Sequence, residues 1–141
     1  MGRLLGIDFG TRRIGVAVSD ELQGLARGLA TLQYRGMDAA AQEIADLTGT
    51  WGIERVVVGL PRHMNGSEGE SAEAARQLAA LVASRTGLPV ILWDERLSTK
   101  GAERLLIEAD LPRARRRRII DQQAAQWILQ SYLDQWHGPT S

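Results

Sequence analysis

Two short apolar runs near the N-terminus, joined by a glycine-containing connector, constrain the fold of this chain most. The runs span residues 4–9 and 14–18, and residues 10–13 between them read GTRR. Branched apolar residues flanked by glycine are typical of strands, and so short a connector predicts a β-hairpin. One residue departs from the pattern, because Asp8 lies inside the first run. An ionised carboxylate among apolar side chains needs a cation, a hydrogen-bond donor or a chemical role.

Two interpretations of Asp8 remain open at this point. The simpler one is structural: the carboxylate accepts hydrogen bonds from the Thr11 hydroxyl and from nearby backbone amides. The other is that Asp8 holds a metal ion, because carboxylate oxygens are the ligands that hard divalent cations prefer.

Strand and helix patterns alternate after the hairpin. Asp38 is a candidate N-cap, and Gly49 and Gly87 are candidate helix ends. The order predicts an α/β fold with a five-stranded mixed sheet, three antiparallel strands and then two parallel ones, with helices on both faces and one domain over residues 1–141. The further strands are expected at 24–32, 56–60 and 89–93, and the helices at 38–47, 70–86, 99–108 and 119–136.

Composition excludes several classes of protein. The 141 residues include no cysteine, so neither disulfides nor thiolate chemistry is available, and a cytoplasmic location is expected. No apolar run approaches the roughly 18 residues of a membrane span, and the N-terminus has no signal-peptide pattern. The formal net charge is zero. The basic residues are unevenly distributed, however, because five arginines fall within residues 113–118.

Carboxylates occur at three places in otherwise apolar surroundings: Asp8, the pair Asp94-Glu95, and Asp121 near the start of the last expected helix. Ligands of such sheets bind beyond the carboxyl ends of the parallel strands, so Asp8 and the Asp94-Glu95 pair should share one edge. Three converging carboxylates suit a pair of Mg²⁺ or Mn²⁺ ions. Taken alone, Asp121 also fits an acid favoured by the helix macrodipole. Asp94 or Glu95 could likewise pair with a nearby basic side chain.

Four motifs resemble the YqgF/RuvX family over essentially the whole chain. They are GIDFGTRRIGVAVSD, VVGLPRHMNGSEG, DERLST and RRRRIIDQQAAQWIL. The resemblance implies a ribonuclease H-like fold and a nuclease, to which Holliday junction resolution and 5′-end processing of pre-16S rRNA are ascribed. It also implies that Asp8, Glu95 and Asp121 are the metal-binding catalytic residues. None of the three positions departs from the family pattern.

The arginine run leads directly towards Asp121. A run of charge is commonly a solvated loop, but arginine also binds phosphate in a bidentate, weakly hydrated manner. Contacts to phosphates give affinity without reading sequence. The candidate nucleic-acid-binding residues are Arg62, Arg96, Arg113, Arg115, Arg116, Arg117 and Arg118.

The sequence therefore favours a metal-dependent nuclease acting on structured nucleic acid, either precursor rRNA or branched DNA. One alternative is a nucleic-acid-binding module without activity, although such a module would tolerate loss of the carboxylates. Another is an ATPase of the actin and Hsp70 type, because GIDFGT resembles its first phosphate loop. That superfamily needs a second lobe, for which the chain shows no second hairpin. A symmetric junction resolvase would favour a homodimer, whereas an rRNA-trimming enzyme would not need one.

Overall fold

The computed structural model describes residues 2–10, 12–61, 69–94 and 113–137, of which 113–120, 136 and 137 are described by their backbone alone. The expected helix at 99–108 and the loop that contains Arg62 lie outside these ranges. Within them, no helix combines the length and apolar character that crossing a membrane requires.

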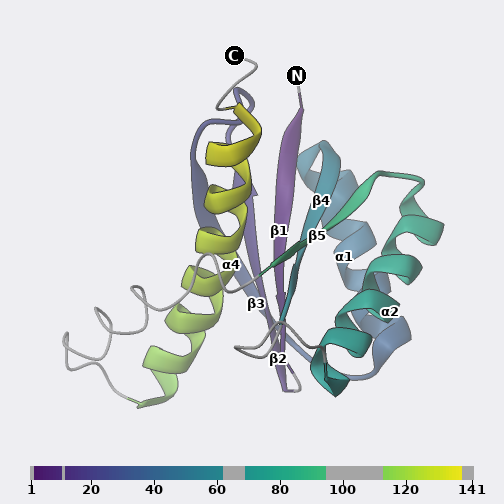
Figure 1. The fold of residues 1–141 in the computed structure, drawn as a ribbon. Coiled ribbons are helices and arrows are strands. Elements are labelled where there is room, and N and C mark those ends of the chain that lie inside the picture. Colours follow the sequence, from purple (N-terminus) through teal and green to yellow (C-terminus); the bar gives the residue numbers. More distant parts are fainter. Residues whose placement is uncertain (1, 11, 62–68, 95–112, 138–141) are drawn as a thin grey trace.

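Five strands form a single mixed sheet in the order β3-β2-β1-β4-β5 (Figure 1). The first three are antiparallel neighbours, and β4 and β5 join β1 in parallel. The predicted sheet is confirmed, with β1 at its centre. The strands are β1 Arg3–Phe9, β2 Arg13–Ser19, β3 Ala26–Gln33, β4 Ile53–Leu60 and β5 Val90–Asp94.

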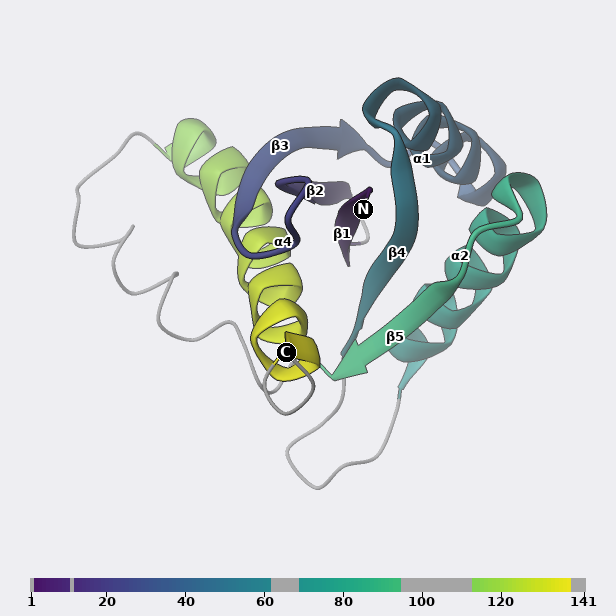
Figure 2. The ribbon, with the colours of Figure 1, turned by 90° about the horizontal axis from the view of Figure 1, so that it is seen from above.

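Helices cover both faces of this sheet, as expected. Helices α1 (Met37–Trp51) and α2 (Glu70–Thr86) lie together on one side, and α4 (Arg113–His137) crosses the other (Figure 2). Each side buries its own apolar cluster. Alternate residues of β1 divide between the two, because Leu5 and Ile7 face α1 and α2 whereas Leu4 faces α4.

The ends of α1 differ from the prediction. Its N-cap is Gly36 rather than Asp38, which lies in the first turn, and the helix continues through Gly49 to Trp51. Gly52 ends it in the left-handed conformation, at φ 62°, which glycine adopts without a steric penalty. Gly87 ends α2 in the same way, as predicted.

Helix α4 begins six residues earlier than the expected start at residue 119. Its first residue is Arg113, so the arginine run forms helix rather than loop. Asp121 consequently lies about two turns inside α4 instead of at its head. The macrodipole acts mainly within the first turn, so it no longer accounts for an acid at this position.

Substituting Leu129 with alanine tests how much the α4 side of the sheet contributes to stability. Leu129 is fully buried, in contact with the glycine-containing face of β1. Leu129→Ala should lower the free energy of unfolding by about 2–5 kcal/mol, because a cavity remains where the side chain packed. Chemical denaturation provides the measurement. Leu22→Ala is the control, because Leu22 is 72% exposed and its truncation should change stability by less than about 0.5 kcal/mol.

Candidate active site

Asp8 is the next-to-last residue of the central strand and points to the α4 face. Side chains alternate along a strand, so Asp8 shares its face with Leu4 and Gly6. Leu4 packs in the α4 cluster, and a Cβ on Gly6 would meet Leu129 Cβ at 2.7 Å. The side chain of Asp8 is only partly buried, unlike its apolar neighbours Ile7 and Phe9. It therefore lies at the edge of the core, where a charge remains accessible.

Gly15 lies directly opposite Asp8 in the antiparallel pair of β1 and β2. Paired residues direct their side chains to the same face, and at Gly15 that space is filled by the backbone of Asp121. A Cβ on Gly15 would lie 1.9 Å from the Asp121 carbonyl oxygen. Only glycine allows this approach, and it brings Asp121 over the strand pair that carries Asp8.

The carboxylate of Asp121 is held by Arg13. The Arg13 Nε–H group donates to Asp121 Oδ2 at 2.6 Å, and the two side chains are only 26% and 19% exposed. Arg13 and Gly15 are two positions apart on β2 and so share a face. The sequence analysis did not identify Arg13 as a site residue, although the strand alternation that places it beside Gly15 was readable in the hairpin motif.

Asp94 ends β5 and pairs with Leu60 at the end of β4. Along β5, Val90 and Leu92 pack with the cluster under α1 and α2, whereas Ile91 and Trp93 pack with the α4 cluster. Strand alternation assigns Asp94 to the first group and therefore to the face opposite Asp8. Glu95, the residue predicted to be catalytic, lies outside the described residues.

The part of the chain that the structure describes contains no group of three or more residues able to hold a metal ion. Of the predicted set, Asp8 pairs with Gly15 in the sheet and the backbone of Asp121 contacts Gly15, whereas Glu95 lies outside the described residues. The two that are present offer only carboxylate oxygens, the donor chemistry of Mg²⁺ and Mn²⁺ rather than of zinc or copper. Their chemical character thus fits the predicted cation.

The predicted basic residues fall into two groups. Arg62 and Arg96 lie outside the described ranges. Arg113 and Arg115 to Arg118 form the first turns of α4 as a helical backbone. Arg117 and Arg118 come one turn before Asp121 along this helix. In Figure 1 these turns lie at the same end of the sheet as the connection between β1 and β2.

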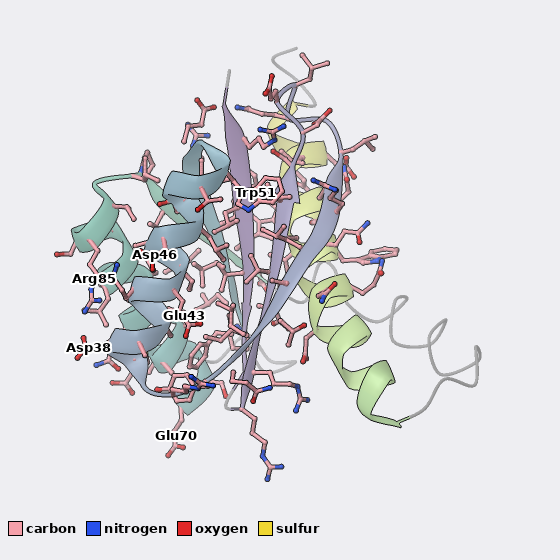
Figure 3. The ribbon with its side chains drawn as sticks, turned by 180° about the vertical axis from the view of Figure 1, so that it is seen from behind. Asp38, Glu43, Asp46, Trp51, Glu70 and Arg85 are labelled. Carbon is pink, nitrogen blue, oxygen red and sulfur yellow. The ribbon has the colours of Figure 1, made fainter. Side chains whose placement is uncertain are left out.

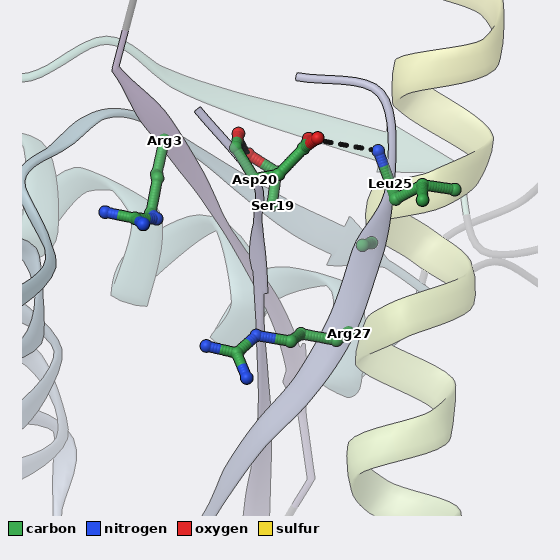
Figure 4. Close-up of a pocket in the computed structure, with 6 residues that line it drawn as sticks. Arg3, Ser19, Asp20, Leu25 and Arg27 are labelled. Atoms are coloured by element: carbon green, nitrogen blue, oxygen red, sulfur yellow. Dashed lines mark hydrogen bonds between the residues drawn. The ribbon is translucent and has the colours of Figure 1, made fainter. Parts of the chain in front are cut away.

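A pocket of about 460 Å³ lies at the other end of the sheet, away from Asp8 (Figure 4). Its Asp20 carboxylate accepts hydrogen bonds from the backbone N–H groups of Leu25 and Gly24, which lower the pKa of Asp20. Because these bonds close the turn before β3, this acid has a structural role. The pocket is lined by Arg3, Ser19, Asp20, Leu25, Ala26 and Arg27.

Comparison with known proteins identifies the family. A model of the family described as "RuvX: Holliday junction resolvase" matches residues 2–135. The chain belongs to the RuvX family. A Pelotomaculum thermopropionicum protein named "Putative pre-16S rRNA nuclease" is 50% identical over 138 residues, which cover 97% of this chain and 90% of that protein. A Moorella thermoacetica protein of the same name is 52% identical over 132 residues, which cover 94% of each chain.

Solved structures confirm the ribonuclease H-like fold of this RuvX family member. Thermus thermophilus RuvC in complex with a Holliday junction substrate has a TM-score of 0.61 at 17% identity, covering 98% of this chain and 97% of that one. The fowlpox virus resolvase with junction DNA has a TM-score of 0.57 at 10% identity, covering 96% and 99%. The resemblance read from the four motifs is therefore confirmed, and the family supports nuclease activity.

Gly15→Ala tests whether the close approach of α4 to β2 forms the site of this RuvX protein. The new methyl group would overlap the Asp121 carbonyl, so α4 must shift. We expect a loss of about 1–3 kcal/mol in stability from overpacking. Nuclease turnover should fall by roughly 10²-fold, the effect of misplacing a reacting group by about 1 Å. Denaturation and single-turnover cleavage measure the two effects.

Gly49→Ala is the matched control, because a Cβ there meets no atom within 4 Å. Alanine inside α1 should stabilise the protein by roughly 0.5–1 kcal/mol and leave cleavage unchanged. Full activity of Gly15→Ala would contradict the requirement for close approach.

Proposed function

We propose that this chain is a metal-dependent nuclease that hydrolyses phosphodiester bonds in structured nucleic acid, with Asp8, Glu95 and Asp121 as its metal-binding catalytic residues. The observation that carries the proposal is the close approach of the Asp121 backbone to Gly15, the residue that pairs with Asp8 across the two strands. Membership of the RuvX family supports the nuclease activity.

The protein's part in this chemistry is to hold carboxylates rigidly. Asp8 is fixed by the central strand, which pairs with β2 on one side and β4 on the other. Asp121 is fixed by its backbone contact with Gly15 and by the bond from Arg13. One or two Mg²⁺ or Mn²⁺ ions bound by these carboxylates would activate water and stabilise the leaving oxygen. No side-chain nucleophile is then needed.

Charge distribution supports an approach of the nucleic acid from the α4 side. On the opposite side, the labelled side chains of α1 and α2 are mostly acidic (Figure 3). Arg85 in that layer already bonds the Asp38 carboxylate. The first turns of α4 contain five arginines and precede Asp121. A phosphate backbone is attracted to this end of α4 and repelled by the α1 and α2 layer. The labelled acids of that layer are Asp38, Glu43, Asp46 and Glu70.

For the substrate we propose precursor rRNA, because relatives of about half identical sequence carry the name of a pre-16S rRNA nuclease. A cytoplasmic location accords with such a substrate. The second candidate is the four-way DNA junction, which the family description favours.

A cleavage panel of rRNA precursor, four-way junction, duplex and single-stranded DNA, each with Mg²⁺ or Mn²⁺, separates the two candidate substrates. Binding without cleavage of any substrate would instead identify a non-catalytic module. A homodimer is expected only if the junction is cleaved symmetrically.

Asp121→Asn and Asp8→Asn test the carboxylates. Each keeps the side-chain shape but removes a charge, so single-turnover cleavage in Mn²⁺ should fall by roughly 10²-fold or more. Nucleic-acid affinity should hold or rise, because a negative charge near the phosphates is gone. For Asp121→Asn, stability should change by no more than about 1 kcal/mol, since the lost pair with Arg13 is partly exposed.

Asp134→Asn is the control for Asp121→Asn. Asp134 is an exposed acid of the same helix, whose carboxylate accepts a bond from Gln130. The Asp134→Asn variant should cleave nucleic acid at the wild-type rate. Normal cleavage by Asp121→Asn, or undiminished wild-type cleavage in excess EDTA, would contradict the metal-dependent site.

The double variant Arg116→Ala/Arg117→Ala tests the basic turns of α4. If these arginines bind phosphates, all nucleic-acid substrates should bind more weakly and about equally. The slope of log K against log salt should flatten by roughly 0.7–0.9 for each lost contact. Fluorescence anisotropy at several salt concentrations measures the slope. Arg85→Ala, in the opposite helix layer, should leave it unchanged. An unchanged slope in the double variant would identify the run as a solvated helix surface.

A further inference from the structure

The ion pair between Arg13 and Asp121 joins two elements that both contribute to the proposed site. Arg13 begins β2, and Asp121 lies inside α4. The bond runs from Arg13 Nε to Asp121 Oδ2 at 2.6 Å, and both side chains are partly buried. A hydrogen bond between ionised groups is stronger and more directional than a neutral one. It therefore restricts how the Asp121 carboxylate can rotate.

Arg13 is itself held in place from two directions. Its backbone pairs with Gln33 of β3, and its carbonyl accepts a hydrogen bond from Gly10 N–H at 2.9 Å. Gly10 directly follows the end of β1, so the turn after Asp8 also fixes the base of the Arg13 side chain. Asp8, Arg13 and Asp121 are thus positioned by one hairpin and the helix that rests on it.

The two carboxylate oxygens of Asp121 can take different partners. Oδ2 accepts the bond from Arg13. A carboxylate offers about four lone-pair sites on two oxygens, so Oδ1 keeps its capacity to bind a cation. Carboxylates that bind metals are themselves usually held by hydrogen bonds, and these outer partners set the orientation of the ligand. Arg13 occupies that outer position relative to Asp121.

We propose that Arg13 is a positioning residue, which holds Oδ2 of Asp121 so that Oδ1 faces the cation shared with Asp8. This inference rests on the proposed function of the site and gives a role to Arg13, which lies in the first of the four motifs but had none in the sequence analysis. The Arg13 bond persists when the cation binds, because the two partners use different oxygens. Arg13 acts through Asp121 rather than on the substrate.

Arg13→Lys and Arg13→Ala test the inference by kinetics. Lysine keeps the charge but lacks the Nε–H of the planar guanidinium, so it should not restore the orientation. At saturating Mn²⁺, the single-turnover rate should fall roughly 10–100-fold in both variants, the usual cost of losing an outer partner. Affinity of Arg13→Lys for nucleic acid should stay close to that of the wild type. Arg85→Ala removes an ion pair on the other side of the sheet and should cleave normally.

A second readout does not depend on activity. The Arg13 Nε–H proton should give a slowly exchanging ¹⁵N NMR signal, assigned by its absence in Arg13→Lys. The signal should remain when Mg²⁺ saturates the wild-type protein. Its loss on Mg²⁺ binding would show that the arginine is displaced and would overturn the inference.

The two proposals fail in different ways. Full-rate cleavage by Arg13→Lys, together with an inactive Asp8→Asn, would overturn the role of Arg13 and leave the nuclease site intact. If Mg²⁺ shifts no signal of the residues around Asp8 and Asp121, the metal site and the positioning role are both overturned.

Discussion

The close approach of α4 to the β1–β2 hairpin is the contact on which the rest of this structure depends. Packed layers of secondary structure are normally kept apart by the side chains between them, as in stacked sheets, which lie about 10 Å apart. Here Gly6 and Gly15 remove that separation, because a Cβ on Gly6 would lie 2.7 Å from Leu129 Cβ and a Cβ on Gly15 would lie 1.9 Å from the Asp121 carbonyl oxygen. The apolar side chains of α4 then close the cluster beside Leu4. One contact therefore provides both the packing of the second helical layer and the position of an acidic residue.

This contact also determines the electrostatics of the site. It brings Asp121 close to the strand that carries Asp8, at the edge of an apolar core where charge is costly to bury. The Arg13 guanidinium offsets part of that cost by pairing with Asp121. The same group of residues thus explains why the charges are tolerated and why their geometry is fixed. A site of this kind needs no pocket, and the pocket around Asp20 lies at the other end of the sheet.

Much of the fold was predictable because it follows from local patterns. The strand runs, the helix at 70–86 with its Gly87 end, and the order of parallel and antiparallel strands were all confirmed. The boundaries of α1 and α4 were wrong. A glycine inside a helix resembles a stop signal, and a run of arginines resembles a loop, yet arginine is a good helix former and packing further along α4 extends the helix.

The sequence by itself determined the family and the sheet, because periodicity and motif spacing are recorded along the chain, and it predicted a site that includes Asp8 and Asp121. Tertiary structure alone decided how those residues are placed. The two-residue alternation of β5 assigns Asp94 to the face opposite Asp8. The pairing of Arg13 with Asp121 spans 108 positions. No local pattern encodes such a contact, since it depends on how closely a helix rests on glycines in strands formed much earlier in the chain.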